Sequence, residues 1–357
     1  MNRPSGQAVI GSDGQRRSDA LASLLHKKRG GTDLFVASTY KDILAFISQR
    51  ALKHKVIRLG AKVTHVISKN SKETAAGSRT TIKTDDGEEA AFDEVVVTCP
   101  LGWLKVNAQK VFTPALHPRL LQAINNIKYV TDVSPTEESH NLTPLHSYGC
   151  LDKIYLTFPE AFWLKGGCPV FTHFHNPDYV SHASDAPCNA VIISLAHLPR
   201  GTAHPTLMFY IYGPCSAQLL KYLEHLGLQS DAYNKCVDAF AQPHYSRMPN
   251  YYKENASCRP VSCMCTAWQR DPLAGNGSYT HFRKGVTNAA EDVEVMRNSA
   301  GLGESKGIWI AGEHTAPTGL IATTTGAYIS GQRIARKICD KWSIGGTVNT
   351  VLKTSRI

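Results

Sequence analysis

Residues 307–338, GIWIAGEHTAPTGLIATTTGAYISGQRIARKI, contain the pattern that decides the fold class of this chain. A short apolar run predicts a buried strand over Gly307–Ala311, and a loop rich in Gly and Thr leads from it into a helix predicted from about Ala322 to Asp340. The first turn of such a helix leaves backbone N–H groups without helical partners and has the positive end of the helix dipole. This unit suits an electron-rich group at the turn, although the same pattern also describes an ordinary strand–loop–helix unit.

A compact β-meander and one helix are predicted upstream of that segment. Apolar or alternating runs between turn signals predict the four strands Val56–Leu59, Val63–Ile67, Thr80–Thr84 and Glu94–Thr98. Pro114 is predicted to open the helix that follows, because apolar residues after it recur at helical spacing.

The middle of the chain predicts a second group of strands and helices. Apolar runs predict strands at Lys153–Phe158, Val170–Phe174, Ala190–Leu195 and Leu207–Tyr212. Helical spacing predicts helices at Tyr40–Ala51, Ala217–Leu226 and Asp231–Phe240. Together the segments indicate an α/β chain of mixed α+β character, and 357 residues suggest about two domains.

Composition and charge exclude several classes of protein. Hydrophobic residues make up 42% and charged residues 19%, which is typical of a globular chain. No apolar run approaches the roughly 18 residues of a membrane span, and the N-terminus lacks the pattern of a secretory signal. The net charge of +10 is concentrated in part near the N-terminus, and no motif for reading nucleic acid accompanies it.

The ten cysteines predict reduced thiols rather than a metal site. Their one cluster, Cys258, Cys263 and Cys265, does not have the spacing of a zinc site, and no pair of histidines follows it. Without a secretory signal the chain is expected to be intracellular, where thiols stay reduced.

Four blocks of sequence, in order along the chain, resemble the flavin-dependent amine oxidases. This family includes monoamine oxidases, polyamine oxidases and lysine-specific histone demethylases. The blocks are DEVVVTCPLGWLK (93–105), FTPALHPRLLQAINNIKY with GCLDKIYLTFPEAFW (112–129 and 149–163), TAWQRDPLAGNGSYTHF (266–282) and the segment at 307–338. The resemblance covers about residues 30–340, and four blocks in the family's order indicate membership more strongly than any one of them.

The resemblance implies FAD as cofactor and assigns residues to it. Glu313, Thr323 and Thr324 match the positions that contact flavin, and Val63 matches the strand position whose backbone contacts the adenine. Trp268 is expected to pack against the cofactor or the core rather than to bind substrate. A helix N-terminus would stabilise the negative charge that develops on the N1–C2=O edge of a reduced flavin.

Lys153 is the sharpest candidate for a catalytic residue. It lies at the start of an otherwise apolar strand, where burial favours the neutral amine. The resemblance implies that it holds a water molecule beside flavin N5 and assists reoxidation and imine hydrolysis. The alternative is a lysine at a strand end that extends its ammonium group to solvent.

Tyr279 and Thr323 are the predicted substrate-binding residues. In the monoamine oxidases a Cys-Tyr pair occupies the position of Ser278-Tyr279, and its cysteine is bonded to the flavin. Because serine cannot form that thioether, FAD is expected to bind non-covalently. Tyr279 would form one wall of an aromatic cage for the amine. The opposing position is Thr323, so the cage would be half open. The alternative is a core tyrosine.

The sequence also departs from the family. The initial G-x-G-x-x-G unit and the acidic residue for the ribose are not found, which suggests an N-terminally truncated member. The predicted organisation is a truncated Rossmann-like FAD-binding domain, interleaved with a substrate domain of a mixed sheet and helices. Residues 57–105 and 266–342 are assigned to the first domain, and 30–56 and 106–265 to the second. The remaining segments are a disordered basic leader (1–29), an insertion read as a surface loop or a retained intron (130–148) and a tail (343–357).

The implied activity is oxidation of a primary or secondary amine to an imine, with O2 reduced to H2O2. Two alternatives remain open: an inactive fragment of this family without flavin, and an enzyme similar to L-amino-acid oxidases, for which no carboxylate-binding arginine can be assigned. The expected location is the cytoplasm or, because Ser355-Arg356-Ile357 resembles the S-K-L address, the peroxisome.

Overall fold

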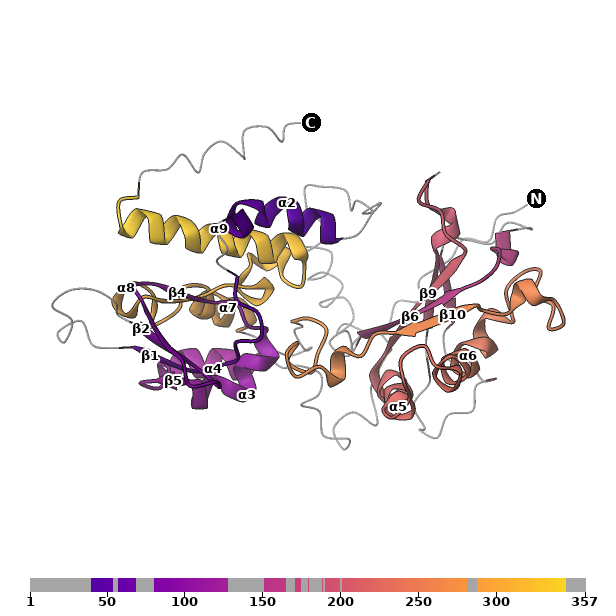
Figure 1. Cartoon of the computed structure of the whole chain (residues 1–357), viewed down its shortest axis with the longest axis horizontal. Coiled ribbons are helices and arrows are strands. Elements are labelled where there is room, and N and C mark those ends of the chain that lie inside the picture. The colour runs from indigo at the N-terminus through magenta and orange to yellow at the C-terminus, as the bar shows by residue number, and fades with distance from the viewer. Residues whose placement is uncertain are drawn as a thin grey trace.

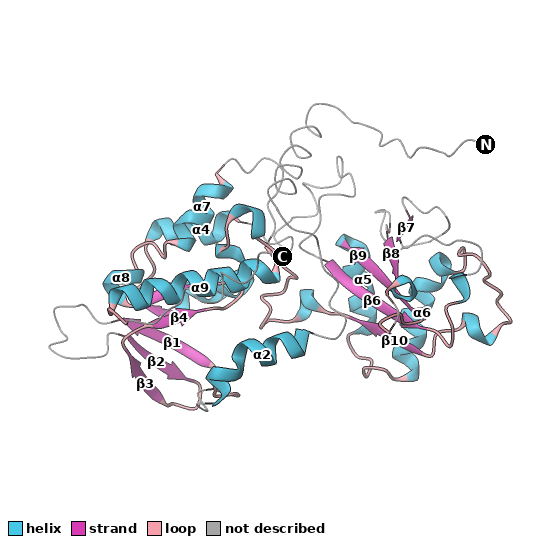
Figure 2. Cartoon of the chain, turned by 90° about the horizontal axis from the view of Figure 1, so that it is seen from above, coloured by secondary structure: helices cyan, strands magenta, loops and turns pink. Residues whose placement is uncertain are grey.

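The chain forms two parts, each with its own hydrophobic core (Figures 1 and 2). The computed structural model describes residues 40–53, 57–68, 80–127, 151–164, 171–174, 179, 188, 190–199, 201–280 and 288–344. The predictions for residues 1–29, 130–148 and 355–357 therefore lie outside the described residues. The mixed α/β character predicted from the sequence is confirmed.

The first part contains most of the predicted meander. Strands β1 (Val63–Ser68), β2 (Thr80–Thr84) and β3 (Glu89–Phe92) pair antiparallel in sequence order. The short β5 (Phe112–Thr113) adds parallel to β1, with Val66 opposite Phe112. The predicted strand Val56–Leu59 does not form over its described residues 57–59.

Strand β4 (Val95–Val97) leaves the meander and pairs in parallel with β11 (Ile308–Ile310). This corrects the prediction that it is the fourth strand of the meander. The physical reason is burial, because Val95, Val97 and all three residues of β11 are buried. An apolar strand of this kind is more stable between layers than at the edge of an exposed ribbon.

Helix α9 (Thr324–Lys341) lies beside this strand pair and is fastened at its far end (Figure 1). The Glu94 carboxylate accepts from Trp309 Nε1 at 2.6 Å and from Trp342 Nε1 at 2.7 Å, and it pairs with the Lys341 ammonium group at 2.5 Å. These three partners hold the pKa of Glu94 below its ordinary value, although burial opposes them most strongly. Glu94 therefore fixes the end of α9 against β4 and β11.

Helices α3 (Leu101–Val111), α4 (Pro118–Asn126), α7 (Ala289–Arg297) and α8 (Gly303–Lys306) complete the first part. The sequence predicted that Pro114 opens α4, but the helix begins at Pro118. His117 is the reason, since its side chain accepts from Arg119 N and caps the helix with proline at the first position. The buried carboxylate of Asp292 on α7 accepts from Arg119 at 2.6 Å and joins the two helices.

The second part is a five-stranded sheet with helices on one face (Figure 1). Its strands are β6 (Leu151–Thr157), β7 (Phe171–Phe174), β8 (Ala190–Ser194), β9 (Thr206–Tyr212) and β10 (Ser262–Cys265), in the order β10–β6–β9–β8–β7. All the described pairs are antiparallel, where the sequence predicted a mixed sheet. Helices α5 (Gly213–Leu223) and α6 (Asp231–Tyr245) cover the face that forms the core.

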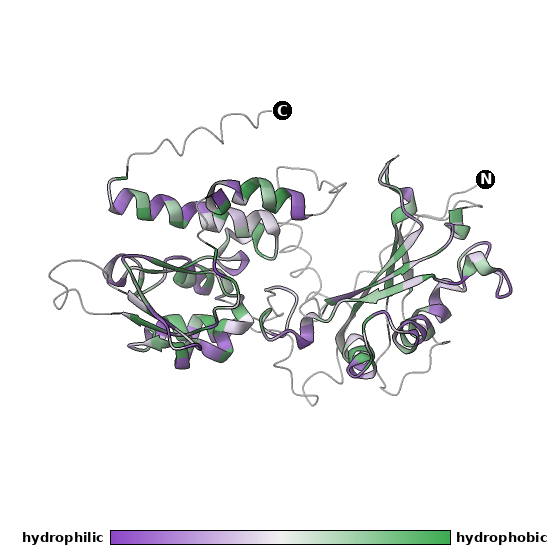
Figure 3. Ribbon diagram, viewed as in Figure 1, coloured by the Kyte–Doolittle hydropathy of each residue, from purple (hydrophilic) through white to green (hydrophobic). Residues whose placement is uncertain are grey.

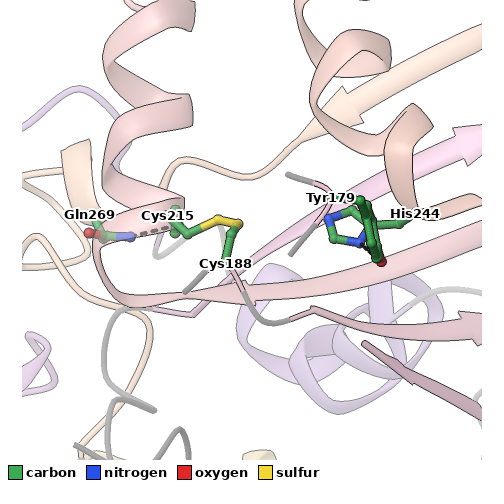
Figure 4. The surroundings of a disulfide bond; sticks show 6 residues. Tyr179, Cys188, Cys215, His244 and Gln269 are labelled. Carbon is green, nitrogen blue, oxygen red and sulfur yellow. Dashed lines mark hydrogen bonds between the residues drawn. A yellow bond between two sulfur atoms is a disulfide. The ribbon is translucent and has the colours of Figure 1, made fainter. Parts of the chain in front are cut away.

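The structure joins Cys188 and Cys215 in a disulfide, which corrects the expectation that all the thiols are reduced (Figure 4). The spacing of the cysteines gives no sign of this pair, because 27 residues separate them and only the fold brings their Cα atoms to 5.3 Å. Cys258, Cys263 and Cys265 are buried free thiols. Burial raises the pKa of Cys263 to about 12, so this thiol stays protonated and unreactive.

Helix α2 (Tyr40–Lys53) has an apolar side that is exposed (Figure 3). Phe46 on this helix is 80% exposed. None of the helices in the described ranges is long and apolar enough to cross a membrane.

Candidate active site

The segment Ser278-Tyr279-Thr280 joins the two parts of the chain. Ser278 Oγ accepts from the backbone N–H of Leu151, which opens strand β6, at 3.3 Å. Two residues later, Thr280 N donates to the Glu313 carboxylate at 3.0 Å. Through these two hydrogen bonds, the segment with the half-buried Tyr279 links the strand of Lys153 to the segment before α9.

Glu313 fastens both ends of the loop that precedes α9. It opens the short 3-10 helix η8 (Glu313–Thr315), and its carboxylate also accepts from Ala322 N at 2.8 Å. Burial raises the pKa of Glu313 above its ordinary value, while the hydrogen bonds from Thr280 and Ala322 oppose that rise. The Glu313 side chain therefore sets the shape of the loop that runs between two of the predicted flavin contacts, Glu313 and Thr323.

Thr323 and Thr324 lie at the N-terminus of α9. Thr323 is the N-cap: its hydroxyl accepts from Gly326 N at 2.9 Å and donates to Leu320 O at 2.6 Å. Thr324 and Thr325 are exposed in the first turn, where N–H groups have no carbonyl partner within the helix. Gly326 is required here, because a Cβ atom would lie 2.0 Å from Leu320 O.

A close contact between two glycines joins the 93–105 block to the 266–282 block. A Cβ atom on Gly102, in the first turn of α3, would lie 2.1 Å from Gly275 O. Gly275 has φ +80°, a conformation that side chains disfavour. Because neither residue has a side chain, the two backbones can touch at this point, and the contact holds the segment before Ser278 against the first part.

Lys153 lies on β6 and is half-buried, as predicted. Burial lowers the pKa of Lys153 below its ordinary value, and the nearby Tyr40 offsets part of that change. Its Nζ lies 5.1 Å from the centroid of the Tyr210 ring. The backbone is held on both sides by Thr266, which accepts from Lys153 N at 2.9 Å and donates to Lys153 O at 2.9 Å.

Lys153 belongs to the face of the sheet opposite α5 and α6, here called the outer face. Side chains alternate along β6, and the register places the residues of β8, β9 and β10 beside them. Burial raises the pKa of Tyr155 and of Tyr210, so both phenols stay neutral. The described residues of the outer face include Leu151, Lys153, Tyr155, Val191, Ile193, Met208, Tyr210 and Met264, with Thr157, Thr206 and Ser262 at the far end of β6.

Val63 and Trp268, the remaining predicted cofactor contacts, lie on other elements. Val63 begins β1, is half-buried and packs against the core of the first part. Trp268 opens the 3-10 helix η7 (Trp268–Arg270), and 43% of it is exposed. Its backbone N–H donates to Asp152 Oδ1 at 3.0 Å.

Sequence reasoning missed Asp152, His314 and Thr280. Asp152 is completely buried, and the signal was available, since a residue next to Lys153 on a strand must point into the core. His314 is also completely buried, and burial lowers its pKa to about 4, so the ring is neutral. Thr280 stands beside Tyr279, but its bond to Glu313 depends on folding.

The residues at this junction fit the ring half of FAD. The donors at the start of α9 are backbone N–H groups and threonine hydroxyls, which suit the electron-rich N1–C2=O edge of a flavin. An amine of lowered pKa and two neutral phenols lie on the outer face. Glu313, Thr323 and Thr324 would hold the ring, and Lys153 would face its reactive edge.

Comparison with known sequences identifies the family of the chain. The profile of the family described as flavin containing amine oxidoreductase matches residues 4–339. The match begins within residues 1–29, for which the sequence predicted a leader. Because it covers nearly the whole chain, the chain belongs to this family of flavin-containing amine oxidoreductases.

Individual relatives are distant. Human lysine-specific histone demethylase 2 is 24% identical over 264 residues, covering 74% of this chain and 26% of the demethylase. The peroxisomal N(1)-acetyl-spermine/spermidine oxidase of Bos taurus is 24% identical over 330 residues, covering 88% of this chain and 54% of the oxidase. Lysine-specific histone demethylase 1 homolog 2 of Arabidopsis thaliana is 27% identical over 250 residues, covering 69% of this chain and 26% of the relative. The matches thus span about a quarter to a half of these relatives.

Proposed function

We propose that this chain holds FAD non-covalently at the N-terminus of α9 and oxidises an amine there. The supporting observation is the bridge of Ser278 and Thr280, which ties the strand of Lys153 to the loop that Glu313 shapes. Family membership supports the reaction class, and the joined segments support this junction as the proposed site.

The proposed reaction converts an amine and O2 into an imine and H2O2. FAD supplies the two-electron chemistry, taking a hydride equivalent from the carbon beside the nitrogen and passing both electrons to O2. Water then hydrolyses the imine to an aldehyde, with release of ammonia from a primary amine or of a shortened amine from a secondary one. In this chain Lys153 would hold that water. Burial lowers the pKa of Lys153, so more of its amine is neutral and able to accept a hydrogen bond or a proton from water. Tyr279 and Thr323 would flank the amine.

The outer face favours an amine with one nitrogen and an apolar substituent. Among the strand residues that the structure describes near Lys153 on this face, Lys153 is charged and its neighbours are aromatic, aliphatic or thioether side chains, while the hydroxyl side chains of Thr157, Thr206 and Ser262 lie at the far end of β6. A polyamine would place extra ammonium groups on that surface without a carboxylate to pair with, at a cost in desolvation and repulsion. The relatives named for acetylated spermine and spermidine differ from this expectation in their substrates.

Spectroscopy of the purified protein tests the cofactor, and a peroxide assay tests the reaction. We expect stoichiometric bound flavin by absorbance, and release of that flavin on denaturation because the bond is not covalent. Benzylamine should yield more H2O2 than spermine does. Colourless protein that gains no flavin on reconstitution would instead favour the inactive-fragment alternative.

The variant Lys153→Met tests the assigned role of the lysine. We expect slower reoxidation of reduced flavin by O2, with the flavin content and the thermal unfolding midpoint close to those of the wild type. Tyr222→Phe on the exposed surface of α5 serves as the control. Equal reoxidation rates in Lys153→Met and the wild type would remove Lys153 from the mechanism.

A further inference from the structure

A completely buried carboxylate, Asp152, lies beside Lys153 and is saturated with hydrogen bonds. Its Oδ1 accepts from Thr266 Oγ1 at 3.0 Å and from Trp268 N at 3.0 Å. Its Oδ2 accepts from Ser216 Oγ at 2.8 Å and from Gln269 Nε2 at 2.8 Å. Two donors for each oxygen satisfy a carboxylate, and without them a buried charge would be very costly.

The four donors come from three separate places in the fold. Ser216 belongs to α5, Thr266 follows the end of β10, and Trp268 and Gln269 lie in η7. Gln269 also donates to Ser216 Oγ at 2.8 Å, which closes the network. Asp152 therefore fastens the segment that leads to Ser278 onto the sheet that carries Lys153.

The network reaches Lys153 through Thr266. A threonine hydroxyl has one proton, and here it is donated to Asp152. The lone pairs of the same oxygen accept from Lys153 N at 2.9 Å. The carboxylate thus fixes the rotamer of the hydroxyl that holds the Lys153 backbone. Because neighbouring strand residues point to opposite faces, Asp152 acts on Lys153 without pairing with its ammonium group.

We propose that Asp152 is a positioning residue of the amine-oxidising site, which sets the place of Lys153 and of the Trp268–Tyr279 segment at the junction of the two parts. This inference rests on the proposed function for its catalytic consequence. The structural claim, that Asp152 positions Lys153 through Thr266, does not depend on bound flavin.

The variant Asp152→Asn tests the proposal with little change in shape. An asparagine amide has one oxygen and one NH2 group, so it cannot accept from all four donors. Ser216 can rotate its hydroxyl and Gln269 can flip its amide to face the new NH2 group, so the amide oxygen keeps Thr266 and Trp268 as donors. A neutral amide oxygen is a weaker acceptor than a carboxylate oxygen, so the variant should fold with Thr266 and η7 held less firmly.

Asp238→Asn is the matched control. Asp238 is a second carboxylate in this part of the chain, and it accepts from Tyr245 OH at 2.6 Å. Burial raises the pKa of Asp238 above its ordinary value. It lies on α6, on the core side of the sheet, and has no contact with Thr266 in the described network. The same substitution there changes stability without touching Lys153.

Two measurements carry the test. The first is the pH titration of Lys153 in the protein after reductive ¹³C-methylation, observed by NMR and assigned by comparison with Lys153→Met. The second is reoxidation of reduced flavin in the loaded protein. We expect Asp152→Asn to change the pH at which Lys153 titrates and to slow reoxidation about 10- to 100-fold, the size expected for misplacement by about 1 Å. Asp238→Asn should leave both unchanged.

The outcomes separate this inference from the proposed function. A Lys153 titration and a reoxidation rate in Asp152→Asn that match the wild type would overturn the positioning role. If Asp238→Asn shifts Lys153 by the same amount, the effect is general loosening, and the proposal also fails. If the wild type binds no flavin, the proposed function fails, while a Lys153 titration that moves in Asp152→Asn alone still supports the coupling.

Discussion

The two parts of this chain are assembled in different ways. In the second part, β6, β8 and β9 pair antiparallel around one core beneath α5 and α6. In the first part, β4 pairs with β11 although more than 200 residues separate them, and α9 completes the layer. The second part therefore depends mainly on burial of local strands, whereas the first depends on distant segments fitting together. The candidate site lies where both are joined.

Phe209→Ala should give the largest effect and should act on the second part. Phe209 on β9 is completely buried in its core, and removing such a ring costs about 3–5 kcal/mol. Calorimetry should show the unfolding transition of the second part at a lower temperature. Leu228→Ala, at a position that is 70% exposed, is the control and should change little. If both parts lose stability equally, they unfold as one unit and the comparison is wrong.

Gly326→Ala should act on the first part instead. A Cβ atom at this position would lie 2.0 Å from Leu320 O and 2.8 Å from the Cβ of Ala316, so the start of α9 must shift. Overpacking of this kind costs about 1–3 kcal/mol, and flavin binding should weaken with it.

Gly331→Ala on the same helix is the matched control. Nothing lies within 4 Å of a Cβ atom at Gly331, so alanine should stabilise α9 by about 0.5–1 kcal/mol through helix propensity. Denaturant unfolding of both variants distinguishes steric contact from propensity. Equal stabilities would show that the start of α9 does not need the close approach that Gly326 allows.

The sequence predicted the second part better than the first, for a physical reason. Strands such as β9 are apolar runs bounded by turns, and a local pattern is enough to find them. The partner of β4 could not be predicted from its own three valines, because parallel pairing depends on where the chain returns. Helix α3 was missed, since Leu101–Val111 follows a strand directly and no side chain caps its start.

The candidate site shows the same division. Lys153, Tyr279, Thr323 and Glu313 were predicted as site residues because the family resemblance marks them. Asp152 and Thr280 were missed, although they make the hydrogen bonds that unite the junction. Residues that touch a cofactor leave a motif, whereas residues that hold those residues in place are visible only once the donors and acceptors of distant segments are seen together.

The contribution of Glu313 to the pH dependence of the first part should be opposite in sign to that of a carboxylate whose pKa is lowered, such as Glu94. The pKa of Glu313 is raised in the folded protein, so in that pH range the folded state binds more protons than the unfolded state. The stability contributed by this group is therefore present at low pH and is lost as pH rises from the ordinary pKa of glutamate through the raised one. Glu313→Gln should remove this slope from the transition of the first part, and the transition of the second part is an internal control in the same scan. A slope that survives the substitution would assign the titration to another group, and the loop before α9 would then be held by the hydrogen bonds of residue 313 without its charge.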